Sequence, residues 1–229
     1  MLNFCCRESA GRCKVYGIER SFVSNTEPLR VILNKNVEID SPPRPRMLKN
    51  RALFMDRDGV INVERCYVHS REAFQFQDGI FELCLAAQTL GYLLLVVTNQ
   101  AGIARGYYTE SQFLELTEWM VREFTERKIQ ITRVYYCPYH PIHGVGQYKY
   151  DSPDRKPKPG MLLRAREDFH LDMVSSVLVG DQLSDIDAAQ AAGVGTKILY
   201  RRGPAEAQDR CHSSDSLDAI RCHFFPPPA

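Results

Sequence analysis

The 229-residue sequence has almost no net charge and no long apolar run. Its 29 basic and 28 acidic residues leave a formal charge of +1, which gives no reason to expect a surface for nucleic acid or for a membrane. No stretch reaches the roughly 18 apolar residues of a membrane span, and residues 1–13 lack the apolar core of a secretion signal. We therefore expect a cytoplasmic protein with no nucleic-acid or membrane partner.

The eight cysteines also lack the regular spacing of a disulfide framework, so reduced thiols are expected. With 44% hydrophobic residues, the chain is long enough for one domain with a substantial core. We place this domain at residues 51–225 and expect it to be monomeric. Residues 1–50 read as a poorly ordered extension, with the proline-rich residues 41–46 as a linker. Whether Val31–Leu33 adds an edge strand stays open.

From residue 51 onward, short apolar runs alternate with segments of helical periodicity. The predicted strands are 52–56, 92–97, 134–136, 177–179 and 196–200, and the predicted helices are about 78–90, 109–126, 159–169 and 185–192. The expected helix caps are Asp78, the capping box Thr109 and Gln112, and Ser184 or Asp185. Strands alternating with helices predict an α/β fold with a doubly wound, Rossmann-like parallel sheet.

The segment Asp56-Arg57-Asp58-Gly59 directly follows the first predicted strand. Such a strand ends at the carboxyl edge of the sheet, where open α/β folds bind ligands. Side chains at i and i+2 project the same way, so the two carboxylates share one cleft, where their repulsion favours a cation or a shared proton. Gly59 permits a sharp turn there. The pattern suits phosphoryl transfer with a nucleophile, an acid/base and Mg²⁺, although two aspartates in a simple turn would look the same.

Three more polar segments stand at ends of predicted elements. Thr98-Asn99-Gln100 follows the second strand and offers hydrogen-bond donors to a phosphate. Asp181 follows the fourth strand, with Asp185 one helical turn beyond. Residues 155–158 place positive charge just before a helix start, where anions are favoured. Each segment alone is compatible with a turn, a cap or a solvated face, but together they predict one site at the carboxyl edge of the sheet.

Four motifs resemble those of the haloacid-dehalogenase-like phosphohydrolases: Asp56-x-Asp58-Gly59, Thr98-Asn99, Lys156 and Gly180-Asp181-x-x-x-Asp185. Within that superfamily, residues from about 51 to 221 are similar to the D-glycero-D-manno-heptose-1,7-bisphosphate 7-phosphatases. The similar stretches are residues 67–69, 97–106, 116–120, 135–138 and 155–161. The resemblance implies a haloacid-dehalogenase-like fold, and the short intervals 59–78 and 100–134 leave no room for a large cap domain.

The same resemblance implies a Mg²⁺-dependent phosphatase that removes the 7-phosphate of a heptose bisphosphate, in the synthesis of activated heptose for bacterial surface glycans such as lipopolysaccharide. Asp56 would attack phosphorus to form an aspartyl-phosphate, and Asp58 would act first as acid and then as base. Thr98 and Lys156 would stabilise charge on the phosphoryl group. The implied Mg²⁺ ligands are the Asp56 carboxylate, the Asp58 backbone carbonyl and Asp181.

The expected partner is thus a small phosphorylated sugar. Substrate contacts implied by the motifs are Glu64, Arg65, Cys66, Tyr67, Asn99, Gln100 and Arg155. Arg155 suits a second phosphate, because a guanidinium can bind two oxygens at once.

The loop after the third predicted strand departs from this family. Many members hold a structural zinc there, with ligands in a Cys-x-His and a Cys-x-Cys pair. Here Tyr139 stands in place of the histidine, and Ser152 and Asp154 replace the later cysteines. Because a closed tetrahedral site needs four ligands, we expect no structural zinc. An alternative ligand set stays open, made of Cys137, His140, His143 and Asp151.

A second departure is Gln182, where the family often carries a lysine that contacts substrate phosphate. The absence of this lysine weakens the case for a bisphosphate substrate. A histidinol-phosphate phosphatase, or another small phosphomonoester phosphatase, therefore stays as the alternative. A polynucleotide 3′-phosphatase is disfavoured by the missing basic patch. A catalytically idle scaffold is a further alternative, disfavoured because it has no need of three carboxylates and a lysine in one place.

Overall fold

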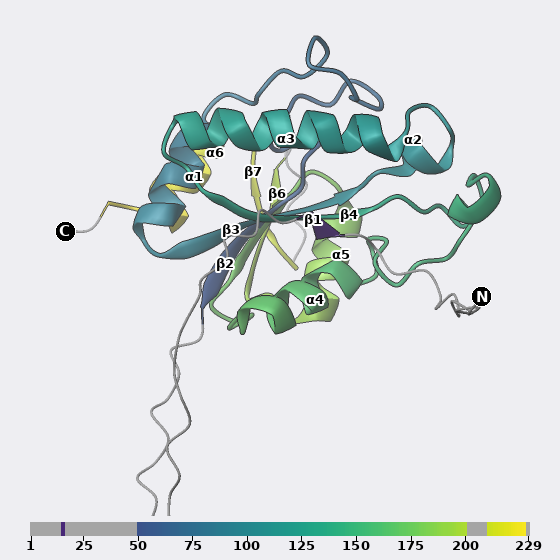
Figure 1. Cartoon of the computed structure of the whole chain (residues 1–229). Helices are drawn as coiled ribbons and strands as arrows, with labels where there is room; N and C mark the ends of the chain where they lie inside the picture. The colour runs from purple at the N-terminus through teal and green to yellow at the C-terminus, as the bar shows by residue number, and fades with distance from the viewer. Residues whose placement is uncertain (1–14, 17–49, 201–209, 228–229) are drawn as a thin grey trace, which may run out of the picture.

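The computed structural model describes residues 15–16, 50–200 and 210–227. Its centre is a seven-stranded sheet in the order β1-β4-β3-β2-β5-β6-β7 (Figure 1). The strands are β1 (Val15–Tyr16), β2 (Arg51–Met55), β3 (Tyr92–Asn99), β4 (Ile131–Cys137), β5 (Val177–Gly180), β6 (Thr196–Tyr200) and β7 (His212–Ser214). All pairs are parallel except β1 with β4, which is antiparallel. The predicted doubly wound α/β fold is confirmed.

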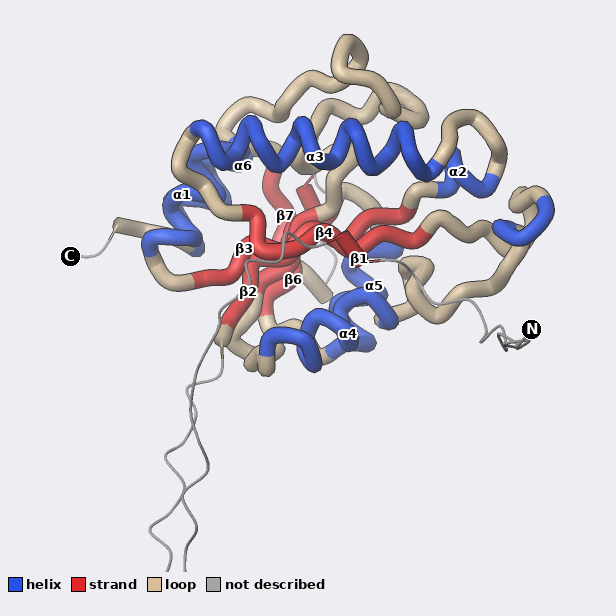
Figure 2. Tube along the Cα trace, viewed as in Figure 1, coloured by secondary structure: helices blue, strands red, loops and turns tan. Residues whose placement is uncertain are grey.

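Helices cover both faces of this sheet, so the molecule has three layers (Figure 2). One face carries α1 (Ile80–Thr89), α3 (Glu110–Glu126) and α6 (Leu217–Phe224), and the other carries α4 (Gly160–Phe169) and α5 (Leu183–Ala192). Two short helices, α2 (Ala101–Ala104) and the 3₁₀ helix η1 (Gly146–Tyr148), lie in the connections after β3 and β4. None of the described helices is both long and apolar enough to cross a bilayer.

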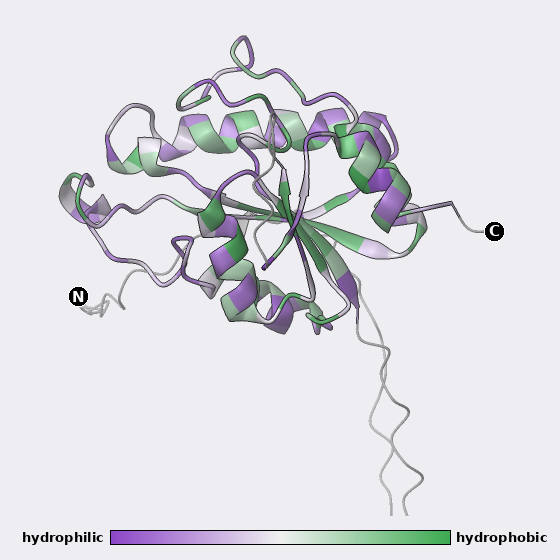
Figure 3. Cartoon of the chain, turned by 180° about the vertical axis from the view of Figure 1, so that it is seen from behind, coloured by the Kyte–Doolittle hydropathy of each residue, from purple (hydrophilic) through white to green (hydrophobic). Residues whose placement is uncertain are grey.

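The strands are apolar on both sides because both faces of the sheet are covered. In β2, Leu53 and Met55 belong to the core under α1, α3 and α6, whereas Ala52 and Phe54 belong to the core under α4 and α5. This period-two alternation divides one buried strand between two cores. Figure 3 shows the central strands as the most continuously hydrophobic part of the chain. The rigid sheet therefore fixes where its carboxyl edge presents polar side chains.

The capping predictions had mixed outcomes. The Thr109–Gln112 capping box at the start of α3 is confirmed. Asp78 is not a cap: α1 is preceded by Gly79 in a left-handed conformation, with no side-chain cap. At α5 the cap is Gln182 rather than Ser184 or Asp185, and the Asp185 carboxylate accepts from the Gln182 N–H in a reciprocal box. Both helices thus begin at a residue other than the one that the motif suggested.

Beyond the predicted elements, the structure adds the strands β1 and β7 and the helix α6, which no sequence pattern indicated. Val31–Leu33 and the proline-rich stretch lie outside the described residues, so the division of the chain near residue 50 stays a prediction. Residues 56–79 form a loop with isolated β-bridges, and α2 and α3 occupy most of the span between β3 and β4. Within the described residues, neither span holds a separate cap domain.

Candidate active site

Asp56 and Lys156 meet at the carboxyl edge of the sheet although 100 residues separate them. Asp56 continues β2, where its N–H donates to the Val179 carbonyl at 3.1 Å. The Lys156 Nζ lies 2.8 Å from Asp56 Oδ2 and 2.6 Å from Asp185 Oδ1. It also donates to the Val97 carbonyl at 2.8 Å. The three charged side chains are almost fully buried, so one ammonium serves two carboxylates in a low-dielectric environment.

Burial and crowding set the charge state of this cluster. The pKa of Asp56 is raised to about 8: burial raises it most, Lys156 opposes that shift, and Asp185 and Asp181 add to it. Burial likewise raises the pKa of Asp181 to about 6, against the hydrogen bond from Gln182. For Lys156, burial lowers the pKa, but Asp185 and Asp56 outweigh it and the net shift is upward. The lysine thus stays charged, whereas Asp56 ionises fully near neutral pH only when more positive charge arrives.

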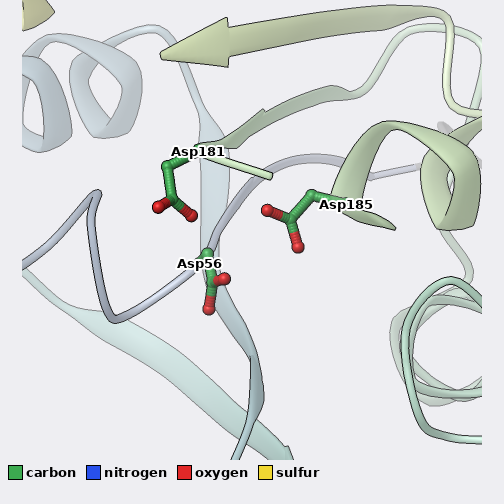
Figure 4. A group of neighbouring side chains, drawn as sticks. All are labelled: Asp56, Asp181 and Asp185. Atoms are coloured by element: carbon green, nitrogen blue, oxygen red, sulfur yellow. The ribbon is translucent and has the colours of Figure 1, made fainter. Parts of the chain in front are cut away.

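The donor set fits a divalent cation. Oxygens of Asp56, Asp181 and Asp185 lie within 4.8 Å of one another, from the ends of β2 and β5 and the first turn of α5 (Figure 4). Asp181 Oδ1 is buried and has no hydrogen-bond partner among the described residues. A hard cation such as Mg²⁺ takes oxygen ligands of this kind. The cluster contains two of the implied ligands, Asp56 and Asp181, and adds Asp185, which the motif reading did not count as a ligand.

Gly59 lets the Asp181 carboxylate lie close against the backbone of the loop after β2. Its φ of +87° is left-handed, and a Cβ there would lie 2.3 Å from Asp181 Oδ2. Any side chain would therefore displace the aspartate as well as strain the backbone.

Asp58 forms the wall of the site beside this cluster. Its carboxylate accepts from the Arg57 guanidinium at 2.8 Å, from Asn62 Nδ2 at 3.1 Å and from Gln100 Nε2 at 3.0 Å. Arg57 is itself buried and also donates to the Val68 carbonyl. The carboxyl group is thus held from several sides rather than free to rotate, which suits a group that must deliver a proton in one direction.

The polar residues Thr98 and Asn99, at the end of β3, have different roles. Thr98 lines the cavity and accepts from Gln100 Nε2 at 2.9 Å. Asn99 Nδ2 donates to the Lys156 carbonyl at 3.0 Å, and the Lys156 N–H donates back to Asn99 Oδ1 at 3.1 Å. This reciprocal pair fastens the segment that carries Lys156 to the end of β3. Asn99 therefore positions the lysine as well as lining the cavity.

A cavity of about 350 Å³ collects most of the sequence-predicted residues. Those that line it are Asp56, Asp58, Glu64, Cys66, Tyr67, Thr98, Asn99, Gln100, Lys156 and Asp181. Two others are not among its lining residues. Arg65 is exposed and donates to Gln75, and Arg155 is half-buried and donates to the Tyr139 carbonyl. Burial lowers the pKa of Arg155.

Sequence reasoning missed Tyr108, which also lines this cavity. It lies in an aromatic-rich stretch whose pattern predicts only packing. No local signal marks its hydroxyl group, because its partner, Gln100, lies eight residues away and comes within reach only when the connection after β3 is folded.

The loop between β4 and α4 holds no cluster of metal ligands in the described structure. Among the described residues, the one group of three or more potential ligands is the aspartate cluster. His140 and His143 lie with ring centroids 4.7 Å apart, but no three of Cys137, His140, His143 and Asp151 meet as a possible metal site. Asp154, at a position that the family gives to zinc, is buried and lies 2.7 Å from Arg164 Nη2 of α4. This ion pair ties the loop to α4 directly before Arg155 and Lys156.

Comparisons with known proteins identify the family of the chain. A family model described as HAD-hydrolase-like matches residues 154–221. A D-glycero-beta-D-manno-heptose-1,7-bisphosphate 7-phosphatase of Vibrio cholerae is 52% identical over 171 residues, covering 74% of this chain and 92% of the relative. A D-glycero-alpha-D-manno-heptose-1,7-bisphosphate 7-phosphatase of Burkholderia mallei is 58% identical over 152 residues, covering 66% and 80%.

Solved structures show the same fold. A HAD-like phosphatase of Mesorhizobium loti has a TM-score of 0.69 and 34% identity, covering 75% of this chain and 84% of that one. The D,D-heptose 1.7-bisphosphate phosphatase of B. bronchiseptica, complexed with magnesium and phosphate, has a TM-score of 0.68 and 22% identity, covering 78% and 99%. The resemblance found in the motifs is thereby confirmed, and the chain belongs to the D-glycero-D-manno-heptose-1,7-bisphosphate 7-phosphatase family of HAD-like hydrolases.

Proposed function

We propose that this protein is a Mg²⁺-dependent phosphatase that removes the 7-phosphate of D-glycero-D-manno-heptose 1,7-bisphosphate. The observation that carries the proposal is the Asp56 carboxylate, 2.8 Å from the buried Lys156 ammonium and beside two further aspartates at one edge of the sheet. A scaffold protein has no use for such a cluster, because buried like charges destabilise a fold unless a ligand neutralises them.

Two displacements at phosphorus make up the reaction. An Asp56 oxygen attacks phosphorus, the bond from phosphorus to the sugar oxygen breaks, and Asp58 gives its proton to that oxygen. Water then attacks the aspartyl-phosphate, Asp58 takes the proton, and Asp56 and inorganic phosphate are regenerated. Lys156 and Thr98 stabilise the negative charge on the phosphoryl oxygens throughout.

The carboxylates of Asp56 and Asp181, with the Asp58 backbone carbonyl, would hold the Mg²⁺ ion. When bound, it supplies positive charge that ionises the aspartates and neutralises the phosphate. The buried, unpartnered Asp181 Oδ1 supports this assignment.

Specificity for the sugar belongs to the loop at the cavity entrance. Glu64, Cys66 and Tyr67 line the cavity there, with Gln182 on another side. The small cavity and the lack of a cap domain in the described residues suit a compact sugar phosphate. Arg155 already donates one N–H to the Tyr139 carbonyl, and Arg65 donates one to Gln75. Either guanidinium would bind a distal phosphate through its remaining N–H groups or by exchanging that partner.

The relatives narrow the substrate to a heptose bisphosphate but not to one anomer, because similar identities go with a beta-specific name in Vibrio cholerae and an alpha-specific name in Burkholderia mallei. A cytoplasmic location and a monomeric state complete the proposal. Size-exclusion chromatography with light scattering checks the oligomeric state.

The decisive experiment is phosphate release from both heptose bisphosphate anomers, histidinol phosphate and a 3′-phosphorylated oligonucleotide, with Mg²⁺ and with EDTA. We expect fastest turnover on a heptose bisphosphate and none with EDTA. Faster turnover of histidinol phosphate would assign the alternative phosphatase activity. Release from none of these esters would identify an idle scaffold.

A further inference from the structure

A buried chain of hydrogen bonds links Tyr108 to Asp58. The Tyr108 hydroxyl donates to Gln100 Oε1 at 2.5 Å. Gln100 Nε2 in turn donates to Asp58 Oδ2 at 3.0 Å and to Thr98 Oγ1 at 2.9 Å. Only 5% of Tyr108 and 1% of Gln100 are exposed. Gln100 Nε2 therefore donates to two side chains of the protein, so the main role of this amide is to hold its neighbours in place.

The tyrosine decides which way this amide points. If the amide turned over while Asp58 is ionised, Gln100 Oε1 would face the carboxylate, and two acceptors would oppose each other without a hydrogen between them. A donor on the Oε1 side selects the favourable orientation. Burial raises the pKa of Tyr108, which keeps the phenol protonated and able to donate.

Packing fixes the position of that hydroxyl. The Tyr108 ring is stacked on His69, with ring centroids 5.1 Å apart and planes 7° from parallel. It shares a small core with Ile103, Phe113 and Tyr136. On the α2 side, a Cβ at Gly102 would lie 2.1 Å from the ring, so the tyrosine fills all of that space. The hydroxyl group thus has one location from which to reach Gln100.

We propose that Tyr108 is a positioning residue for this reaction: through Gln100, it holds the Asp58 carboxyl group in the orientation that protonates the leaving sugar oxygen. The inference rests on the proposed function, because it assigns a task within phosphoryl transfer. It goes beyond that function, because the steps above need no residue at position 108. Arg57 and Asn62 also donate to this carboxyl group. Tyr108 therefore contributes to the orientation of the Asp58 carboxyl group and is not its only support.

The test is Tyr108→Phe, which removes the hydroxyl group alone. Values of kcat/KM are measured for two esters, the heptose bisphosphate and p-nitrophenyl phosphate. The sugar leaves as a poor leaving group that needs the Asp58 proton, whereas p-nitrophenolate leaves without one. The ratio of the sugar value to the aryl value is expected to fall about tenfold, as for loss of one buried hydrogen bond. The value of kcat/KM covers only the steps up to departure of the leaving group. The rate of the later hydrolysis of the aspartyl-phosphate therefore does not affect this ratio.

Two further variants make the result specific. Tyr107→Phe, at the exposed neighbouring tyrosine, is expected to leave the ratio unchanged. Gln100→Leu is expected to lower the ratio by at least as much as Tyr108→Phe. Adding Tyr108→Phe to Gln100→Leu is expected to cause no further fall, since the tyrosine acts through the amide. Thermal melting of each variant shows whether the protein remains folded at the assay temperature.

An unchanged ratio in Tyr108→Phe, an equal loss on both esters, or additive effects in the double variant would each overturn the role of Tyr108. Turnover of neither ester by the unsubstituted protein would instead overturn the proposed function, and the role of Tyr108 with it.

Discussion

The floor and the rim of the cavity are built in opposite ways. The floor, made of Asp56, Thr98, Lys156 and Asp185, is almost fully buried. Asp56 and Thr98 stand at strand ends, Asp185 stands in the first turn of α5, and Lys156 is held by its ion pairs with the two aspartates. The rim, residues 64–67, is exposed and irregular, with two successive non-glycine residues in left-handed conformations, Cys66 and Tyr67. One hydrogen bond from the Cys66 N–H to Glu64 holds its turn.

This contrast separates chemistry from selectivity. A floor fixed by two cores holds its reacting atoms at constant distances, as charge stabilisation in a transition state requires. A rim on an exposed loop tolerates change and contacts the part of the substrate that differs between sugars. Changes to the floor are therefore expected to lower kcat, whereas changes to the rim are expected to raise KM.

The largest effect is expected from Asp56→Asn, which removes the nucleophile from the floor. Turnover should fall by a factor on the order of 10⁴ or more, because the covalent step is lost. The melting temperature should stay at or above the parent value, since a neutral amide removes the cost of burying a charge and the repulsion from Asp185 and Asp181. Phosphate release and thermal melting check both parts. Activity near the parent level would remove Asp56 from its role.

Lys156→Met should come next. Loss of one charge-stabilising donor typically costs on the order of 10²–10³ in rate. Loss of the ammonium also leaves two buried carboxylates unpaired, so the free energy of unfolding should fall by about 3–5 kcal/mol. Denaturant unfolding and kcat measure these effects. The matched control is Lys158→Met, two residues away, whose ion pair with Asp151 is exposed and should contribute little.

The floor also predicts a pH-dependent response to Mg²⁺. Burial raises the pKa of Asp56 to about 8 and that of Asp181 to about 6, above their ordinary value of 3.8. The folded, metal-free protein therefore binds these protons more tightly than the unfolded chain does, and it loses stability as pH rises from about 4 to about 8. Mg²⁺ binds the ionised carboxylates and displaces the protons, so its affinity should rise with pH by up to about tenfold per unit.

Thermal melting with EDTA and with saturating Mg²⁺ between about pH 6 and pH 8 checks this sign. The stabilisation by Mg²⁺ should widen as pH rises. A gap that stays constant, or that shrinks toward high pH, would contradict the assignment of the aspartates as metal ligands.

The smallest effect is expected at the rim. Tyr67→Ala removes an exposed ring that packs edge-on against Tyr107 with centroids 4.8 Å apart. KM for the heptose bisphosphate should rise about tenfold with kcat nearly unchanged, because binding rather than the transition state is weakened. Tyr150→Ala, equally exposed at 39% but outside the cavity, is the control. A fall in kcat with an unchanged KM in Tyr67→Ala would contradict the assignment of selectivity to the rim and chemistry to the floor.

Much of the floor was predictable because its signals are local. A short apolar run marks a buried strand, and the residue after it stands at the ligand-binding edge of the sheet, which located Asp56, Thr98 and Asp181. The positive charge just before a helix start indicated the segment of Lys156, and the family motif selected that lysine. The same motifs added the loop at 64–67, which forms the rim. The helix caps were harder: Asp78 failed because the backbone before α1 turns at Gly79, and Gln182 caps α5 through a reciprocal bond with Asp185.

The directions of side chains on the rim were not predictable. Motif spacing indicated Arg65 as a substrate contact, yet its guanidinium finds Gln75, ten residues away along the loop. A long, exposed, charged side chain has several possible partners, and its interactions with them differ little in free energy. The spacing of residues in a motif therefore does not predict which partner it contacts.

The sequence by itself determined the parallel sheet, the edge at which the aspartates emerge and the family of the chain, because hydrophobic periodicity and motif spacing are short-range properties. Only the tertiary structure decided that Lys156 would neutralise both Asp56 and Asp185, that burial would raise two carboxyl pKa values, and that Tyr108 would orient Gln100. The first two features arise where segments far apart in the chain pack together and exclude water, and the third depends on how the connection after β3 folds back on itself. No local pattern encodes which partners will then meet.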